Sequence, residues 1–246
     1  MKNCKEWLLA FNNLYNNIMS NKAPGLNPYE ISCFLTDAEE AVVMGLYNGS
    51  FGKSFESEED IATFLAPLVR QVEMSEVTDG VFKACSDSHI YTLPADADEI
   101  LVKTLELCYV DAGCKDANGN PIESQAIVKP LTQDEYWHTI RNPFKRQNAN
   151  RVLRLTNTSP ATVDSEGNLS VSKYSELISD REIKKYIVRY ITRPEPIILV
   201  DLKVDGQEIY PTIRGKYRAQ TCLLDDAIHQ AILNEAVRMA KAVWQS

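Results

Sequence analysis

The sequence lacks the long apolar runs that place a chain in a membrane. No stretch approaches the roughly 18 consecutive apolar residues that a membrane-spanning helix needs. The first residues include the acidic Glu6 and lead into short apolar pairs, so they do not form the continuous apolar region of a secretory signal. We therefore expect a soluble protein that is made in a reducing compartment and binds no membrane.

Cysteine and histidine are also scarce. The 246 residues include six cysteines and three histidines, and six cysteines are too few for a disulfide scaffold at this length. No Cys-x-x-Cys pair occurs, and neither Cys108 nor Cys114 has a histidine at the spacing of a zinc site. The sequence therefore predicts free thiols, with no metal and no other cofactor.

Motifs for catalysis are weak. The run Gly52-Lys53-Ser54 is typical of the end of a phosphate-binding loop, but that motif needs a glycine five residues before Gly52, where Tyr47 stands. His138 follows Asp134 and Glu135 and could serve as a general base, yet no serine or cysteine nucleophile accompanies it. A hydrolase centred on His138 stays an alternative, while the sequence favours a protein that is not an enzyme and has no catalytic residues.

Hydrophobic periodicity divides the chain into helical ends and a strand-rich centre. Residues 1–70 have the spacing of short amphipathic helices, and Leu223–Gln245 has that of a long one. Helix starts are predicted at Asn27–Glu30, Thr36–Glu39, Ser57–Asp60 and Thr132–Glu135. Strands are predicted over 81–85, 90–93, 99–110, 124–128, 151–156, 169–178, 185–192 and 197–202.

This order of elements predicts an α+β fold. Neither end of the chain alone presents enough apolar surface for a core, so we expect the N-terminal helices and the long C-terminal helix to form one helical domain. A β-rich domain would then be inserted between them. The expected limits are 1–70 for the N-terminal helical part, 71–205 for the inserted domain and 206–246 for the C-terminal helix.

Charge is unevenly distributed along the chain. The net charge of −8 argues against nucleic acid as the main partner, because phosphate binding needs a basic face. Residues 1–140 carry a net charge of −13, whereas residues 141–193 carry +6. The basic segment could bind phosphate, but opposite charges on one chain favour a head-to-tail contact between identical subunits. The candidate interface residues are Arg141, Lys145, Arg146, Arg151 and Arg154.

Short segments at both ends and in the middle, taken in order, resemble a known family. The segments are Phe11–Ile18, Ser20–Glu30, Phe34–Glu40 with Tyr47–Gly49, Asn142–Arg146, Asn150–Leu155, Tyr190–Leu199, Cys222-Leu223, His229, Ile232-Leu233 and Ala236-Val237. Together they resemble the neck proteins of crAss-like and other Bacteroides phages. More distantly, a strand ending in Arg193-Pro194 before a terminal helix is similar to tail tubular protein A and other head-to-tail adaptors of short-tailed phages. Residues 71–130 match neither family.

The resemblance implies a structural protein of the virion, assembled in the host bacterial cytoplasm. It would form one ring of the portal–tail connector and line the channel through which the genomic DNA is ejected. A dodecamer is expected, because such adaptors match the portal. Its partners would be copies of itself, the portal protein and adjoining tail or ring proteins. The resemblance supplies no catalytic, cofactor or metal residues.

A second class of function stays open. Aromatic residues make up 9% of the chain, and the centre is rich in predicted strands. Both features fit a phage carbohydrate- or receptor-binding module. Such a module would expose aromatic side chains on one face of its sheet.

Overall fold

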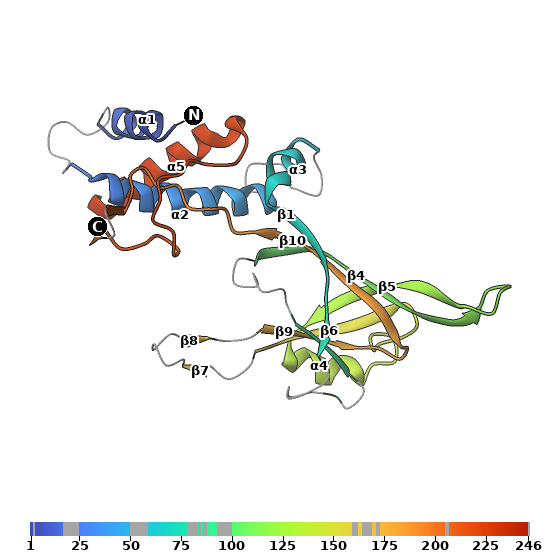
Figure 1. Cartoon of the computed structure of the whole chain (residues 1–246). Coiled ribbons are helices and arrows are strands. Elements are labelled where there is room, and N and C mark those ends of the chain that lie inside the picture. The colour runs from blue at the N-terminus through green and yellow to red at the C-terminus, as the bar shows by residue number, and fades with distance from the viewer. Residues whose placement is uncertain are drawn as a thin grey trace. The chain divides into compact units, whose positions relative to one another are not determined.

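The computed structural model describes residues 1, 3–16, 25–49, 59–77, 83, 85, 88–92, 100–158, 162–163, 169–170, 173–204 and 207–245. The chain divides into two compact units (Figure 1). The helical unit comprises Met1–Leu68 and Arg193–Ser246, and the β unit comprises Val69–Thr192. The combination of helices and a curled sheet confirms the predicted mixture of α and β structure. The inserted-domain arrangement and its limits stay a prediction.

Helices dominate the first unit. Its elements are α1 (Cys4–Asn16), α2 (Pro28–Tyr47), α3 (Glu59–Leu65), a 3₁₀ turn (Ala66–Leu68), a ribbon of β11 (Lys203–Val204) and β12 (Gln207–Glu208), and α5 (Asp226–Gln245). Both α1 and α2 pack against α5. Trp7, Phe11 and Tyr15 recur every four residues along α1 and are buried, which gives that helix its apolar stripe.

The limits of α2 follow from local chemistry. Asn27 accepts a hydrogen bond from the Glu30 N–H, and the Glu30 carboxylate accepts one from the Asn27 N–H, both at 2.8 Å, as the capping box predicted. The helix ends before Gly49, whose φ of 75° suits glycine. The second helix start predicted at Thr36 is wrong, because α2 runs through it without interruption. The Thr36 hydroxyl bonds to Ile197 instead of capping a helix.

The strand predicted over 197–202 is also wrong. This segment is buried but irregular, and a single bridge joins Ile198 to Gln220. The neighbouring amides find partners on α2: the Ile197 N–H donates to Thr36 Oγ1 (3.1 Å) and the Leu199 N–H donates to Ser32 Oγ (3.0 Å). Side-chain hydroxyls of α2 therefore accept the backbone hydrogen bonds that a neighbouring strand would otherwise accept.

The β unit contains one large sheet and one helix. Its elements are β1 (Val69–Glu73), β2 (Glu76–Val77), β3 (Ser88–Thr92), β4 (Ile100–Lys115), β5 (Pro121–Leu131), α4 (Gln133–Ile140), β6 (Arg151–Thr158), β7 (Thr162–Val163), β8 (Leu169–Ser170), β9 (Lys173–Ile178) and β10 (Ile183–Thr192). The predicted strand 169–178 is thus split into β8 and β9. The predicted strand 81–85 and the run Gly52-Lys53-Ser54 lie largely or wholly outside the described residues.

The sheet has the strand order β1-β10-β4-β5-β6-β9-β3-β2, so its two edges are β1 and β2. Only Met74 and Ser75 separate these strands in the chain, which brings the two edges together. The Met74 N–H donates to the Tyr186 carbonyl at 2.8 Å, and the Ser75 carbonyl accepts from the Thr92 N–H at 3.1 Å. The sheet therefore curls into a barrel whose seam is one bent segment.

Alternation along each strand separates an inner from an outer face. Inside the barrel, Cys108 of β4, Val152 of β6 and Tyr186 of β10 belong to one apolar core. On the outside, Tyr136 of α4 packs on a second cluster that includes Leu153, Leu155 and Ile178. Neighbouring strands are antiparallel except for β5 and β6, which are parallel because α4 forms the crossover between them.

Candidate subunit interface

The five basic candidates lie in two different environments of the β unit. Arg141 follows the last residue of α4, and Lys145 and Arg146 lie in the turn after it; all three side chains are exposed. Arg151 and Arg154 lie on β6 and are half-buried. The structure therefore leaves three of the candidates exposed and gives the side chains of the other two partners within the β unit.

A network of hydrogen bonds fixes the turn that carries the exposed group. The Asn142 carbonyl accepts from the N–H groups of Lys145 and Arg146, each at 3.0 Å, and the Asn142 side chain accepts from the Phe144 N–H at 3.0 Å. Arg151 donates from Nη1 to the Phe144 carbonyl at 2.7 Å. Arg151 thus holds the turn rather than extending into solvent.

Two large aromatic side chains lie among these basic residues. Trp137 is 60% exposed and Phe144 is 88% exposed, and Trp137 and Arg141 are four residues apart, hence on one side of α4. Sequence reasoning missed both aromatics as site residues. The available signal was an Asn-Pro-Phe turn enclosed by basic residues. We call Trp137, Arg141, Phe144, Lys145 and Arg146 the aromatic–basic patch.

Arg154 points into the barrel. It shares the inner face of β6 with Val152, and its Nε lies 2.9 Å from Glu106 Oε2. The other Glu106 oxygen accepts from the Tyr186 hydroxyl at 2.8 Å and lies 3.4 Å from Lys103 Nζ. The side chains of Glu106 and Arg154 are only 10% and 13% exposed. An internal carboxylate therefore holds Arg154 within its own subunit.

Burial also affects the other members of this cluster. Desolvation lowers the pKa of Lys103, and the nearby Glu106 carboxylate partly offsets this effect by raising it. Lys103 also donates a hydrogen bond to Ser175 Oγ at 3.2 Å. Burial raises the pKa of Tyr186, and the Glu106 charge adds to that effect. One carboxylate thus lies among two cations and two hydroxyls.

A hollow of about 640 Å³ adjoins the Glu106 cluster. It opens where β4 and β5 stop pairing, beyond the Leu107–Ile127 pair. Its lining includes Lys103, Glu106 and Arg154, with the exposed Ile127 at its side. Within the described residues, no group of three or more His, Cys, Asp or Glu side chains could hold a metal ion. His138 is exposed on α4 and does not line this hollow.

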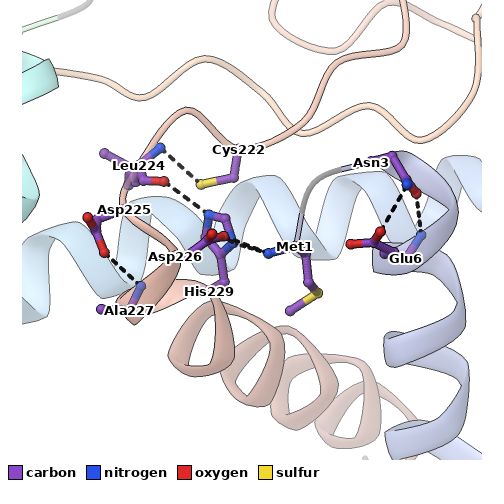
Figure 2. Close-up of polar contacts among 9 residues, drawn as sticks. All are labelled: Met1, Asn3, Glu6, Cys222, Leu224, Asp225, Asp226, Ala227 and His229. Carbon is purple, nitrogen blue, oxygen red and sulfur yellow. Dashed lines mark hydrogen bonds and ion pairs between the residues drawn. The ribbon is translucent and has the colours of Figure 1, made fainter.

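The helical unit contains a cysteine and a histidine close together, shown in Figure 2. The Cys222 thiol accepts from the Leu224 N–H at 3.4 Å (Figure 2). It also donates to Glu39 Oε1 at 2.9 Å. His229 Nε2 lies 3.1 Å from the Leu224 carbonyl, and Nδ1 lies 2.7 Å from the Met1 ammonium, which also contacts Asp226. A carbonyl only accepts, so Nε2 carries a proton, while Nδ1 also lies 2.8 Å from Asp226 Oδ1.

This arrangement does not activate the thiol. Burial raises the pKa of Cys222 and, together with the Met1 ammonium, lowers the pKa of His229. Both imidazole nitrogens already have partners, so His229 has no free nitrogen to take the thiol proton. The cluster instead ties the start of α5 to α2 and to the first residue of the chain.

None of the helices that the structure describes combines the length and apolar character needed to cross a membrane.

The sequence profile of a family described as phage tail ring protein 3/4 matches residues 2–246. Ring protein 3 of Bacteroides phage crAss001 is 35% identical over 239 residues, which cover 96% of this chain and 94% of that protein. Ring protein 4/5 of the same phage is 32% identical over 255 residues, which cover 99% of this chain and 94% of that protein. The resemblance to crAss-like ring proteins is confirmed.

Proposed function

The chain belongs to the phage tail ring protein 3/4 family, and from that premise we propose that it forms one ring of the neck between the portal and the tail of a short-tailed phage. The observation that carries this proposal is the match to two ring proteins along nearly their whole lengths. The aligned residues include both units of the chain and not one module.

The ring consists of copies held by a heterologous contact, in which one surface of a subunit meets a different surface of the next. The exposed basic residues of the aromatic–basic patch provide one of these surfaces. An otherwise acidic chain provides the other, because the net charge of the whole protein is −8. Of the five candidates, Arg141, Lys145 and Arg146 are exposed, whereas Arg154 pairs with Glu106 inside the barrel, so the proposal rests on the exposed three.

The finer features of the assembly follow from the same role. The ring is a dodecamer that matches the portal, and its neighbours are the portal protein and further tail or ring proteins. Genomic DNA passes through its channel without sequence-specific binding, because the net negative charge repels phosphate. The two compact units are proposed to be separate domains, the β-rich one inserted into the helical one.

The alternative of a carbohydrate- or receptor-binding module is not favoured. Its support was the aromatic content and the β-rich centre. The exposed aromatics Trp137 and Phe144 lie on a helix and a turn rather than across a sheet face. Both relatives are ring proteins, which fits assembly better than binding of a sugar.

Imaging of assembled particles tests the proposed function. Cryo-electron microscopy of the portal vertex should show a closed ring of this protein between the portal and the tail. Quantitative mass spectrometry of purified virions should give the same copy number as the portal protein. Absence from purified virions, or presence only at the tail tip, would contradict the proposed role.

A further inference from the structure

The side chains of Phe144 and Trp137 are large and aromatic, yet most of their surface is exposed to solvent. Their exposed fractions are 88% and 60%. Tryptophan and arginine are the side chains most enriched at the energetic centres of protein interfaces, and phenylalanine is enriched in interface cores. The patch combines all three types within ten residues, together with Lys145. Its composition is that of a protein-binding surface.

The patch is also preorganised. Asn142 closes the turn through its carbonyl and its side chain, and Arg151 fixes the Phe144 carbonyl from outside the turn. A turn whose backbone is already held in place loses little conformational entropy on binding. Phe144 is thus an anchor that projects from a rigid base.

A second exposed feature of the β unit has the opposite charge. The ends of β4 and β5 extend beyond the barrel as a two-stranded ribbon, visible in Figure 1. We call residues 111–124 the hairpin arm. It contains three acidic residues and one basic residue, for a net charge of −2, whereas the patch carries +3. Ile122 near its tip is 41% exposed.

Local hydrogen bonds hold the arm at its tip and at its base. The Asp116 carboxylate accepts from the N–H groups of Asn118 and Asn120, each at 2.8 Å, and these bonds hold the pKa of Asp116 below its usual range. At the base, Arg181 donates from Nη1 to the Asp111 carbonyl at 2.9 Å. Among the described residues, β10 pairs with β4 only as far as Val110 and β6 pairs with β5 only from Ile127, so the outer edges of the arm are open to a partner strand or side chain.

Building on the proposed ring function, we infer that the hairpin arm of one copy binds the aromatic–basic patch of the next copy. The two surfaces differ, so the contact is heterologous and repeats around a ring. Six residues at about 3.4 Å each give the arm a reach of about 20 Å. Glu123 and Asp116 meet the basic side chains, and Ile122 packs on the aromatic rings.

A native cysteine makes this contact testable. All six cysteines lie in the described residues, and Cys114, on the arm, is the exposed one. In the full chain, Arg141→Cys, Lys145→Cys and Arg146→Cys are made one at a time and treated with oxidant or a short bis-maleimide. At least one variant should give a ladder of dimers, trimers and larger species on a denaturing gel. The same variant with Cys114→Ser should give no ladder beyond dimer.

Variants at the anchor measure the strength of the contact. Phe144→Ala should weaken self-association by about 30-fold in sedimentation experiments. Phe144→Tyr keeps an aromatic side chain, so its self-association should stay near that of the wild type. Lys145→Glu should weaken association a few-fold, and adding Glu123→Lys should restore it.

The inference is wrong if no cysteine pair gives a ladder, if the ladder persists without Cys114, or if the charge exchange fails to restore association. It is also wrong if the Phe144 variants change the retention of DNA and leave self-association unchanged. These outcomes leave the ring function intact when imaging still shows a ring of this protein in virions. Absence of that ring would instead overturn the proposed function.

Discussion

Glu39 of the helical unit and Glu106 of the barrel are both largely buried, but their surroundings differ. Glu106 lies against Arg154 and Lys103 and accepts from the Tyr186 hydroxyl. Glu39 accepts from one thiol, and its Oε2 has no hydrogen-bond partner among the described residues. Burial raises the pKa of Glu39 to about 7, although the hydrogen bond from Cys222 and the charge of Arg214 act to lower it.

The comparison shows that the partners of a buried carboxylate decide what its removal does. Inside the barrel, Glu106 connects β4, β6 and β10 through Lys103, Arg154 and Tyr186, and its loss leaves two cations without their partner. In the helical unit, the ionised form of Glu39 is the costly one, because little replaces the water it has lost. The barrel should therefore need its buried charge, whereas the helical unit should tolerate or gain from its removal.

The largest effect is expected for Glu106→Gln. This change leaves Lys103 and Arg154 buried without their counter-charge, and breaking such a pair costs about 3 kcal/mol. Urea unfolding followed by circular dichroism should show the loss. The control Glu123→Gln removes an exposed carboxylate 4.0 Å from Lys185 and should change stability little. Equal midpoints for both variants would mean that the internal cluster is not structural.

A slightly smaller effect, dependent on pH, is expected for Glu39→Gln. The folded-state pKa lies above the ordinary value of 4.5, so the folded state binds the proton more tightly than the unfolded state. The stabilisation from the protonated form is complete below pH 4.5 and is lost as pH rises through 7. This loss amounts to about 3 kcal/mol at most.

The Gln variant keeps a neutral side chain at every pH and should unfold at a higher temperature than the wild type at pH 8. At pH 4.5 the two should unfold at similar temperatures. His229 acts in the opposite direction, since its lowered pKa removes stability as pH falls below 6.5. The difference between the two proteins isolates Glu39, and a difference independent of pH would contradict the assignment.

A moderate effect is expected for Thr36→Val. The change keeps the shape of the side chain but leaves the buried Ile197 N–H without its acceptor, at a cost of about 1–2 kcal/mol. Hydrogen exchange should accelerate at residues 197–199. Thr63→Val is the matched control, because the Thr63 hydroxyl bonds to Glu59 on an exposed surface. Similar losses in both variants would argue against a special role for Thr36.

The smallest effect on folding is expected for Phe144→Ala. Phe144 is 88% exposed, so its removal should change the free energy of unfolding by less than about 0.5 kcal/mol. Thermal unfolding of the monomer checks this. A large destabilisation would show that Phe144 packs within its own subunit and is not an anchor for a neighbour.

Local signals in the sequence predicted much of the fold. The capping boxes at Asn27–Glu30 and Thr132–Glu135 were confirmed because their chemistry spans only four residues. Thr36 misled the prediction because a helix-capping hydroxyl and one that binds a distant backbone look alike in sequence. The run 197–202 misled it for a related reason, since burial alone does not distinguish a strand from an irregular segment.

The candidate site was harder to predict. Alternation along 151–155 places Arg154 beside Val152, yet its burial depends on Glu106, 48 residues earlier in the chain. Its partner could not be read from local sequence. The two exposed aromatics were missed because exposure depends on how α4 lies on β6 and β9. The family, in contrast, could be read from short segments in order, since a resemblance does not require their contacts.

The seam of the barrel has a consequence for synthesis. Val69–Glu73 pairs with β10. This early segment can therefore form its strand pairing only after residue 192 has left the ribosome. Until then the nascent chain presents an open strand edge, the kind of surface on which unfinished chains aggregate. Slowing translation before Thr192 has emerged from the ribosome, or supplying a chaperone that shields this edge, should therefore change the yield of native protein more than the same treatment after it has emerged.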